Sequence, residues 1–165
     1  MKNENTQRIT GITGTTGTTA ILALIARVAV AAVFLYAGFS KVGDPAAFAQ
    51  AIERYRIGIV THELAVIAAL YLPLLEITCA IALLFFRKLR AGAAALLAAC
   101  GAVFVVMLAI AIARGLDISC GCFGGADAAT GRAALAISLA RALALALASA
   151  WLLARDIQNP RYGVR

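Results

Sequence analysis

Four long apolar runs are the feature that most limits how this chain can fold. They lie at residues 20–40, 64–86, 91–113 and 133–154. A helix of about 20 apolar residues crosses the hydrocarbon core of a bilayer, where the backbone must satisfy its own hydrogen bonds. The chain is 63% hydrophobic and 14% charged, whereas soluble domains have about 45–50% apolar and about 25% charged residues. The sequence therefore predicts an all-α fold, a bundle of four transmembrane helices surrounded by membrane lipid.

The polar ends of the chain predict a division into three parts. Residues 1–19 are rich in Gly and Thr and carry too little apolar surface to fold, so we expect a disordered tail. The four-span membrane domain covers residues 20–154, and residues 155–165 form a polar C-terminal tail. Because the first apolar run is longer than the apolar core of a signal peptide, we expect it to be retained as a span.

The connector between the first two spans predicts a short helix on the membrane surface. Asp44 is suited to cap a helix, and Pro45 is suited to its first position. The apolar residues that follow, Phe48, Ile52 and Tyr55, repeat on one helical face. We therefore expect an amphipathic interfacial helix between spans one and two.

Lys and Arg are unevenly distributed among the connectors, and this distribution predicts the orientation. The two tails and the second connector carry eight of them, and the first and third connectors carry five. The positive-inside rule places the more basic side in the cytoplasm. We therefore expect a multi-pass protein of the bacterial inner membrane with both termini cytoplasmic. The net charge of +7 comes from residues that flank or interrupt apolar runs, which argues against a nucleic-acid partner.

The sequence Cys120-Gly121-Cys122 in the third connector predicts redox chemistry. A disulfide between these cysteines closes a small ring, and strained, exposed disulfides are the reactive ones. The fourth span begins soon afterwards, and a helix N-terminus favours the reactive thiolate form. Two other interpretations stay open, a structural disulfide and a pair of metal ligands. We predict no metal site, because the chain has one histidine, His62, and shows no other cluster of ligands.

Charged residues inside the spans predict polar contacts within the bundle. Arg27, Glu76 and Arg141 are costly in hydrocarbon and should face the interior. Glu76 and Arg141 fall at a similar depth when residues are counted from the span ends. They therefore predict an ion pair, with Arg27 as a third member. Such a group either fixes the helix register or binds a polar, quinone-type ligand.

Four further residues each have two interpretations. Lys41 and Asp44, at the outer end of the first span, form an interfacial anchor and a helix cap, or else contact the cysteine loop. Cys79 and Cys100 fall at a similar depth. They form a second, buried dithiol, or else serve as small apolar packing residues.

Three stretches of the chain, in the order of the spans, resemble a known family. They read AGFSKVGDPAAFAQAIERYRI, YLPLLEITCAIALL and ARGLDISCGCFGG. Together they resemble the MauE proteins of methylamine utilisation, within the DoxX-like four-helix membrane proteins. The similarity runs from about Arg27 to Leu153. The residues to which it assigns importance are Lys41, Asp44, Pro45, Glu76, Cys120 and Cys122.

The resemblance implies a function in protein maturation. It suggests a periplasmic client dense in disulfides, the small subunit of methylamine dehydrogenase, and a periplasmic thioredoxin-like partner. Similarity to four-helix thiol oxidoreductases of the vitamin K epoxide reductase type further suggests a quinone as electron carrier. That last step is an analogy between folds.

The leading hypothesis is therefore a membrane thiol–disulfide oxidoreductase that uses Cys120 and Cys122. The supporting site residues are Lys41, Asp44, Glu76 and Arg141. A second hypothesis is a non-catalytic assembly factor or scaffold, in which the two cysteines only clip the loop. A third is a small-molecule carrier that uses the charged residues inside the spans.

Overall fold

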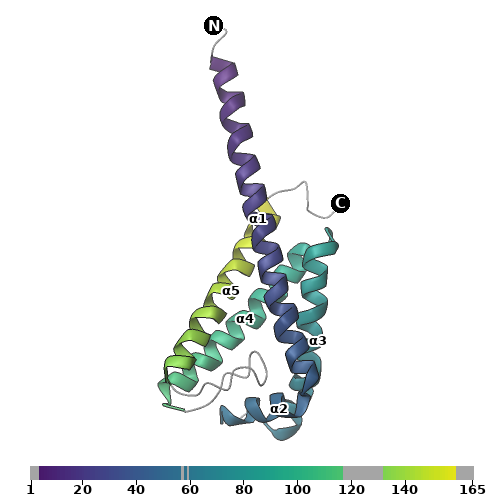
Figure 1. The fold of residues 1–165 in the computed structure, drawn as a ribbon, viewed down its shortest axis with the longest axis vertical. Coiled ribbons are helices and arrows are strands. Elements are labelled where there is room, and N and C mark those ends of the chain that lie inside the picture. Colours follow the sequence, from purple (N-terminus) through teal and green to yellow (C-terminus); the bar gives the residue numbers. More distant parts are fainter. Residues whose placement is uncertain (1–3, 57, 59, 117–131, 159–165) are drawn as a thin grey trace.

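Five helices make up the described part of the chain (Figure 1). The computed structural model describes residues 4–56, 58, 60–116 and 132–158. The helices are α1 (Glu4–Gly43), α2 (Pro45–Arg54), α3 (His62–Phe85), α4 (Arg90–Ala113) and α5 (Arg132–Gln158). The described residues contain no strand, and the all-α prediction is confirmed.

Four of these helices are long and apolar enough to cross a membrane. The spans are Thr18–Gly43, His62–Phe85, Arg90–Ala113 and Ala133–Gln158. They coincide closely with the predicted apolar runs, so the four-span prediction is confirmed. The limits of the three predicted parts, including the disordered tail, stay predictions.

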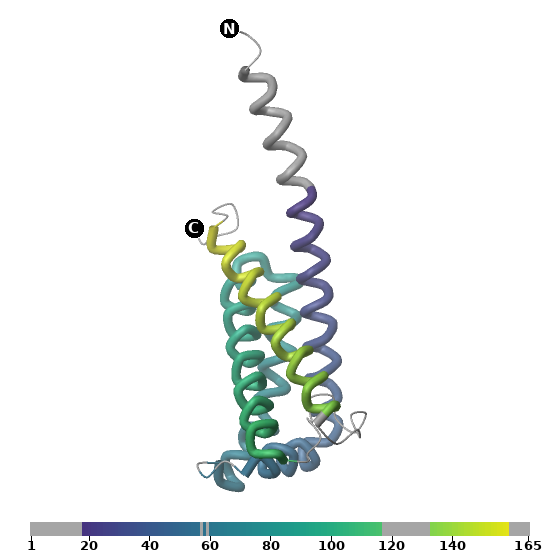
Figure 2. Tube along the Cα trace, turned by 90° about the vertical axis from the view of Figure 1, so that its left-hand side faces the viewer, coloured from purple at the N-terminus to yellow at the C-terminus, as the bar shows by residue number. Residues whose placement is uncertain are grey.

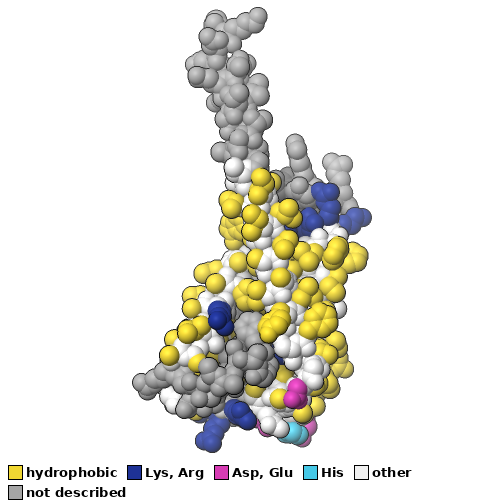
Figure 3. All heavy atoms as spheres, viewed as in Figure 1, with side chains coloured by type: hydrophobic (Ala, Val, Ile, Leu, Met, Phe, Trp, Pro, Cys, Tyr) yellow, Lys and Arg dark blue, Asp and Glu magenta, His cyan; other side chains and the backbone are white. Residues whose placement is uncertain are grey.

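The described surface of the spans that is visible in Figure 3 is largely apolar, as contact with lipid requires. Large hydrophobic side chains that are more than half exposed occur on every span, among them Leu22, Phe39, Phe85, Val103 and Leu147. Soluble monomers rarely expose contiguous apolar surface of this extent, because it would drive association. The surface therefore agrees with the length and composition of the helices in indicating a multi-pass membrane protein.

The four spans are arranged in a ring in the order α1, α3, α4 and α5, with one side open. Helix α1 packs along α3, α4 packs along α5, and α3 meets α4, whereas α1 and α5 share few contacts. Figures 1 and 2 show α2 lying across the end of the bundle at which α1 ends and α5 begins. We refer to this end as the α2 end.

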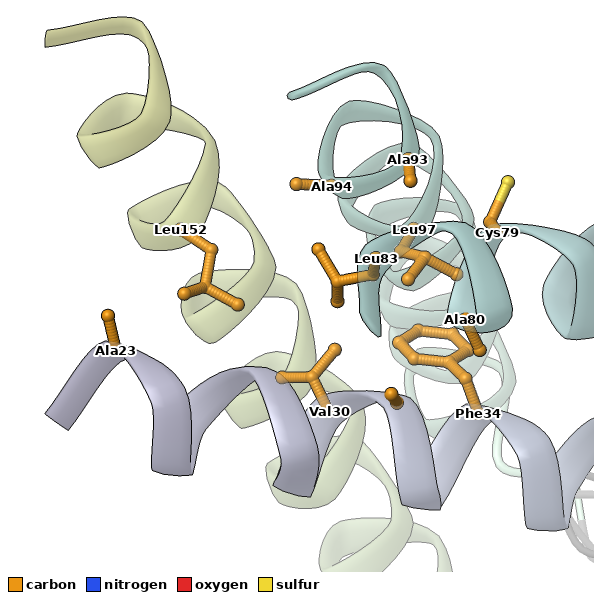
Figure 4. Close-up of a cluster of buried hydrophobic side chains, with 11 residues drawn as sticks. Ala23, Val30, Phe34, Cys79, Ala80, Leu83, Ala93, Ala94, Leu97 and Leu152 are labelled. Carbon is orange, nitrogen blue, oxygen red and sulfur yellow. The ribbon is translucent and has the colours of Figure 1, made fainter. Parts of the chain in front are cut away.

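The core at the other end is built from side chains of all four spans (Figure 4). Val30 and Phe34 of α1 pack with Leu83 of α3, Leu97 of α4 and Leu152 of α5. These side chains are at most 4% exposed. Small residues between them let the helices approach closely, as is common in lipid.

Two glycines mark the places where helix backbones come closest. A Cβ atom on Gly38 of α1 would lie 2.6 Å from Ile77 Cγ1 and 3.2 Å from the Pro73 carbonyl oxygen of α3. A Cβ atom on Gly101 of α4 would lie 3.0 Å from Ala146 Cβ of α5. We call the contact of α1 with α3 and that of α4 with α5 the two closed seams of the bundle. Each is closed at a position where a larger side chain does not fit.

Helix α2 confirms the predicted short amphipathic helix. The Asp44 carboxylate accepts a hydrogen bond from the Ala47 amide at 2.9 Å, and Pro45 occupies the first turn. Phe48 and Ala49 are buried against Ala69 of α3. The predicted cap at Asp44 is thus present, and the apolar face of α2 covers the α2 end of the bundle.

Candidate functional site

A buried ion pair joins α1 to α3 near the α2 end. The Lys41 ammonium donates hydrogen bonds to both carboxylate oxygens of Glu76, at 2.8 Å to Oε1 and 2.7 Å to Oε2. Lys41 is 2% exposed and Glu76 is fully buried. Removing charges from water is expensive, and close pairing with hydrogen bonds offsets that cost.

Two aromatic rings complete the surroundings of the Lys41 ammonium. Its Nζ atom lies 5.2 Å from the centre of the Phe48 ring and 4.6 Å from the centre of the Phe104 ring. A cation within about 6 Å of a ring centre is attracted by the negative face of the ring. Because Phe48 belongs to α2 and Phe104 to α4, this cation interacts with three other helices.

These contacts correct two predictions from the sequence. Lys41 is not an interfacial anchor, because its side chain turns inward and is buried. The partner of Glu76 is Lys41 rather than Arg141. Counting residues estimates depth in the membrane, but it does not tell which side of a helix faces which neighbour. The position of Lys41 in the last turn of α1, from which its long side chain reaches the bundle interior, is the sequence signal that could have indicated this pair.

Arg27 also has a different partner from the one predicted. It pairs with Asp156 of α5, whose carboxylate is almost fully buried, at the end of the bundle opposite to α2. Nearby, the Arg155 guanidinium donates to the Thr19 carbonyl oxygen. The prediction that Arg27 joins Glu76 is therefore wrong, although the expectation that it pairs inside the bundle is confirmed.

A small cavity lies beside the ion pair. It has a volume of about 40 Å³, and its wall includes Lys41, Glu76, Ser138 and Arg141 among apolar residues. A volume of this size holds a few water molecules rather than an organic ligand. The cavity therefore brings three of the predicted supporting residues together, although Asp44 is not among those that line it.

A larger groove lies between α1 and α5. We define the α1–α5 groove by the residues that line it, Ala32, Val33, Tyr36, Arg141, Ala144 and Leu145. Its volume is about 520 Å³, within the range of about 300–1,000 Å³ that is typical of small-molecule sites. Val33, Arg141 and Leu145 also line the small cavity, so the two spaces adjoin.

Arg141 is the polar residue at which the groove and the cavity meet. Its side chain is exposed, and it forms no ion pair with another residue that the structure describes. It lies nine residues into α5, which corresponds to about 14 Å along the helix axis. An Arg at such a depth costs about 2.5–3.5 kcal/mol on insertion scales, which marks it as a candidate functional residue.

The two cysteines in the spans are free thiols. Cys79 is buried, and Cys100 is half-buried. Cys79 packs with Ala80 and Leu83 in the core, as the packing interpretation predicts. Cys100 lies within electrostatic range of Cys79 and of the Lys41–Glu76 pair. A redox role for these two thiols stays a prediction.

The predicted catalytic residues, Cys120 and Cys122, lie outside the described residues. Their position in the chain still restricts where they act. They follow α4 and precede α5, and Figure 1 shows that α4 ends and α5 begins at the α2 end. The connector that carries them is therefore tethered at the same end of the bundle as the Lys41–Glu76 pair.

Comparison with known proteins adds the family to this geometry. The sequence matches the family described as methylamine utilisation protein MauE over residues 19–155. The chain belongs to the MauE family. The match covers nearly all of the four spans, together with α2 and the connector with the two cysteines, and it confirms the resemblance seen in the sequence. No curated protein and no solved structure matches the chain.

Proposed function

We propose that this MauE-family protein is a membrane thiol–disulfide redox protein that supports disulfide formation in a periplasmic client. The observation that carries the proposal is the family match, which spans the Cys120-Gly121-Cys122 connector together with the four membrane helices. A family of methylamine utilisation makes the small subunit of methylamine dehydrogenase the first client to test. The protein would lie in the bacterial inner membrane with this connector on the periplasmic side.

The proposed exchange balances with a dithiol partner of the thioredoxin-like class. A thiolate of the partner attacks one sulfur of the Cys120–Cys122 disulfide, and a mixed disulfide forms as the other cysteine leaves as a thiolate. The second partner thiolate then breaks the mixed disulfide. The partner becomes oxidised, and Cys120 and Cys122 take up its two electrons as a dithiol. The oxidised partner passes its disulfide to the client.

The geometry of the bundle supports this proposal in one respect. Both ends of the cysteine-bearing connector attach at the α2 end, where Lys41 ties α1 to α3 and contacts rings from α2 and α4. A reactive loop needs a rigid base that holds it at a fixed height relative to the membrane. The α2 end provides such a base.

The test is a trapping experiment with single-cysteine variants. In Cys120→Ser or Cys122→Ser, the remaining thiol should trap the thioredoxin-like partner as a mixed disulfide that reductant releases. The double variant should lose client maturation in intact cells. The matched control is the pair Cys79→Ser and Cys100→Ser, which removes the thiols inside the spans and should leave trapping and maturation unchanged.

The competing scaffold function makes the opposite prediction for the same variants. If the cysteines only clip the loop, Cys120→Ser/Cys122→Ser still matures the client whenever the protein accumulates to the normal level. A membrane-impermeant maleimide applied to intact cells then separates the two functions further. Labelling of the two cysteines after reduction supports an accessible periplasmic disulfide, whereas no labelling contradicts both the orientation and the exchange.

A further inference from the structure

We infer that the α1–α5 groove is the binding site of a membrane quinone, with Arg141 as the residue that binds the quinone head. This inference rests on the proposed function, because a protein that takes up electron pairs from a dithiol needs an acceptor to regenerate its disulfide. The groove, the arginine and the adjoining cavity are observations on the described residues that do not involve the two cysteines.

The shape and location of the groove fit a lipid-soluble molecule. It lies on the open side of the four-helix ring, so a molecule reaches it from within the bilayer without any helix separating. Five of its six lining residues are Ala, Val, Tyr or Leu, which suit an isoprenoid tail and the edge of a ring. A volume of about 520 Å³ accommodates a quinone head and the beginning of its tail.

Arg141 provides the polar contact that such a head requires. A guanidinium has five N–H donors and no acceptor, so its complement is a group with acceptor oxygens. A quinone has two carbonyl oxygens, and reduction places additional negative charge on them. A cation that has no ion pair among the described residues therefore favours both binding and reduction of this head.

The depth of Arg141 favours a quinone over a phospholipid. It lies about 14 Å along α5 from the first residue of that helix, which is close to the middle of a hydrocarbon core about 30 Å thick. Lipid phosphates lie at the membrane surface rather than at this depth. A neutral head that moves freely within the hydrocarbon reaches Arg141, whereas a charged phosphate would have to leave the interface.

The redox step balances without any further reactant. The reduced cysteine pair gives two electrons and two protons to the quinone. Two S–H bonds break and one S–S bond forms, while two O–H bonds form on the head to give the quinol. The small cavity next to Arg141 extends to the Lys41–Glu76 pair, and water in it would connect the head to polar groups in the bundle.

The experiment uses the full chain in phosphatidylcholine nanodiscs with a photoreactive azidoquinone as probe. Peptide mapping after illumination should place the label on α1 and α5, and decylubiquinone should compete with it. Ala144→Trp fills the groove with an indole ring from an exposed position, and Arg141→Gln removes the cation. Each should reduce labelling of α1 and α5 at least tenfold.

A matched control separates the groove from the rest of the lipid-facing surface. Ala102 is an exposed alanine on α4 that lines neither the groove nor the small cavity, so Ala102→Trp should leave the labelling unchanged. Label spread evenly over the lipid-facing helices, or insensitive to Ala144→Trp, overturns the inference. Competition by phosphatidylglycerol as strong as that by decylubiquinone also overturns it, because the groove would then be a lipid site.

A cysteine variant distinguishes failure of this inference from failure of the proposed function. Cys120→Ser/Cys122→Ser should keep the labelling of the groove, since binding needs no thiol, and should lose reduction of decylubiquinone by a reduced thioredoxin-like partner. Labelling that persists together with unchanged quinone reduction would leave the groove in place and refute the role of the cysteines. Reduction that depends on the cysteines without labelling of the groove would refute this site alone.

Discussion

The closed seams of the bundle and its open side differ in the side chains that line them. Along the α1–α3 and α4–α5 seams, Gly38 and Gly101 allow contact so close that even a methyl group would clash or crowd. Along the α1–α5 side, the corresponding space is a groove lined by apolar residues and one arginine. In lipid, helices associate through tight packing rather than through the hydrophobic effect. A seam without such packing therefore remains available to a ligand.

The same contrast appears in the two cations that line the small cavity. The Lys41 cation, at a closed seam, has a carboxylate and two aromatic rings as partners. The Arg141 cation, at the open side, has no ion pair among the described residues. Lys41 therefore holds helices together, and Arg141 is suited to a molecule that comes and goes.

The largest effect is expected from separating the partners of the buried pair. Lys41→Met or Glu76→Leu alone leaves one buried charge without its counterion, which should lower the free energy of unfolding by about 3–5 kcal/mol. The double variant Lys41→Met/Glu76→Leu should recover most of this loss. Unfolding by denaturing detergent, followed by circular dichroism, measures all three. A double variant as unstable as the sum of the single ones would show that the two charges act separately.

Adding a methyl group at the closed seams should have the next largest effect. Gly38→Ala places a Cβ atom against Ile77 and the Pro73 carbonyl oxygen, and should cost about 1–3 kcal/mol as overpacked sites do. Gly43→Ala is the matched control in the same helix, because a Cβ atom there meets nothing within 4 Å. It should be neutral or stabilise the helix by up to about 1 kcal/mol. Equal effects at both positions would contradict a seam closed at Gly38.

The sequence predicted the parts of this fold that depend on local patterns. The apolar runs predicted the spans, and Asp44 followed by Pro45 predicted the start of α2, because membrane thickness and helix capping act on neighbouring residues. The partners of Glu76 and Arg27 were predicted wrongly, since they depend on how each helix is rotated about its axis. Nothing in the local pattern reports that rotation.

The candidate site likewise contains residues that a local pattern predicts and residues whose role depends on tertiary packing. The cysteine pair was found from its spacing alone, as a chemical motif that needs no tertiary contact. Arg141 was singled out as a charge within a span, but its place on the open side depends on how α5 is rotated as it packs against the other helices. Such packing depends on residues far apart in the chain. The groove therefore emerged only with the structure.

The burial of Tyr55 reports how closely the end of α2 packs against α4 and α5. It follows α2 and packs with Leu108 and Ala111 of α4 and Leu135 of α5. Burial raises the pKa of Tyr55 to about 12. Because the folded state holds the phenol proton more tightly than the unfolded state, this stabilisation is present below about pH 10 and is lost as the pH rises towards 12.

The wild-type protein should therefore lose up to about 1.4 kcal/mol per pH unit more than Tyr55→Phe does in this window. Unfolding measured at several pH values for both proteins gives the difference. A phenolate absorbance difference between them should titrate near pH 12. Titration near pH 10 would mean that the ring is in water and that α2 does not close over α4 and α5.

The smallest effect is expected at the open side. Arg141→Gln should not lower the free energy of unfolding of the ligand-free protein by more than about 0.5 kcal/mol, because it breaks no ion pair with a described residue and removes a charge that is costly in hydrocarbon. The side chain of Arg141 is also exposed. Denaturing-detergent titration in the absence of quinone measures this. A loss above about 2 kcal/mol would assign the arginine to holding the bundle together, and the distinction between the two cations would fail. A negligible loss, together with the tenfold weaker quinone labelling expected of the same variant, would mean that the charge is kept inside the membrane for binding rather than for folding.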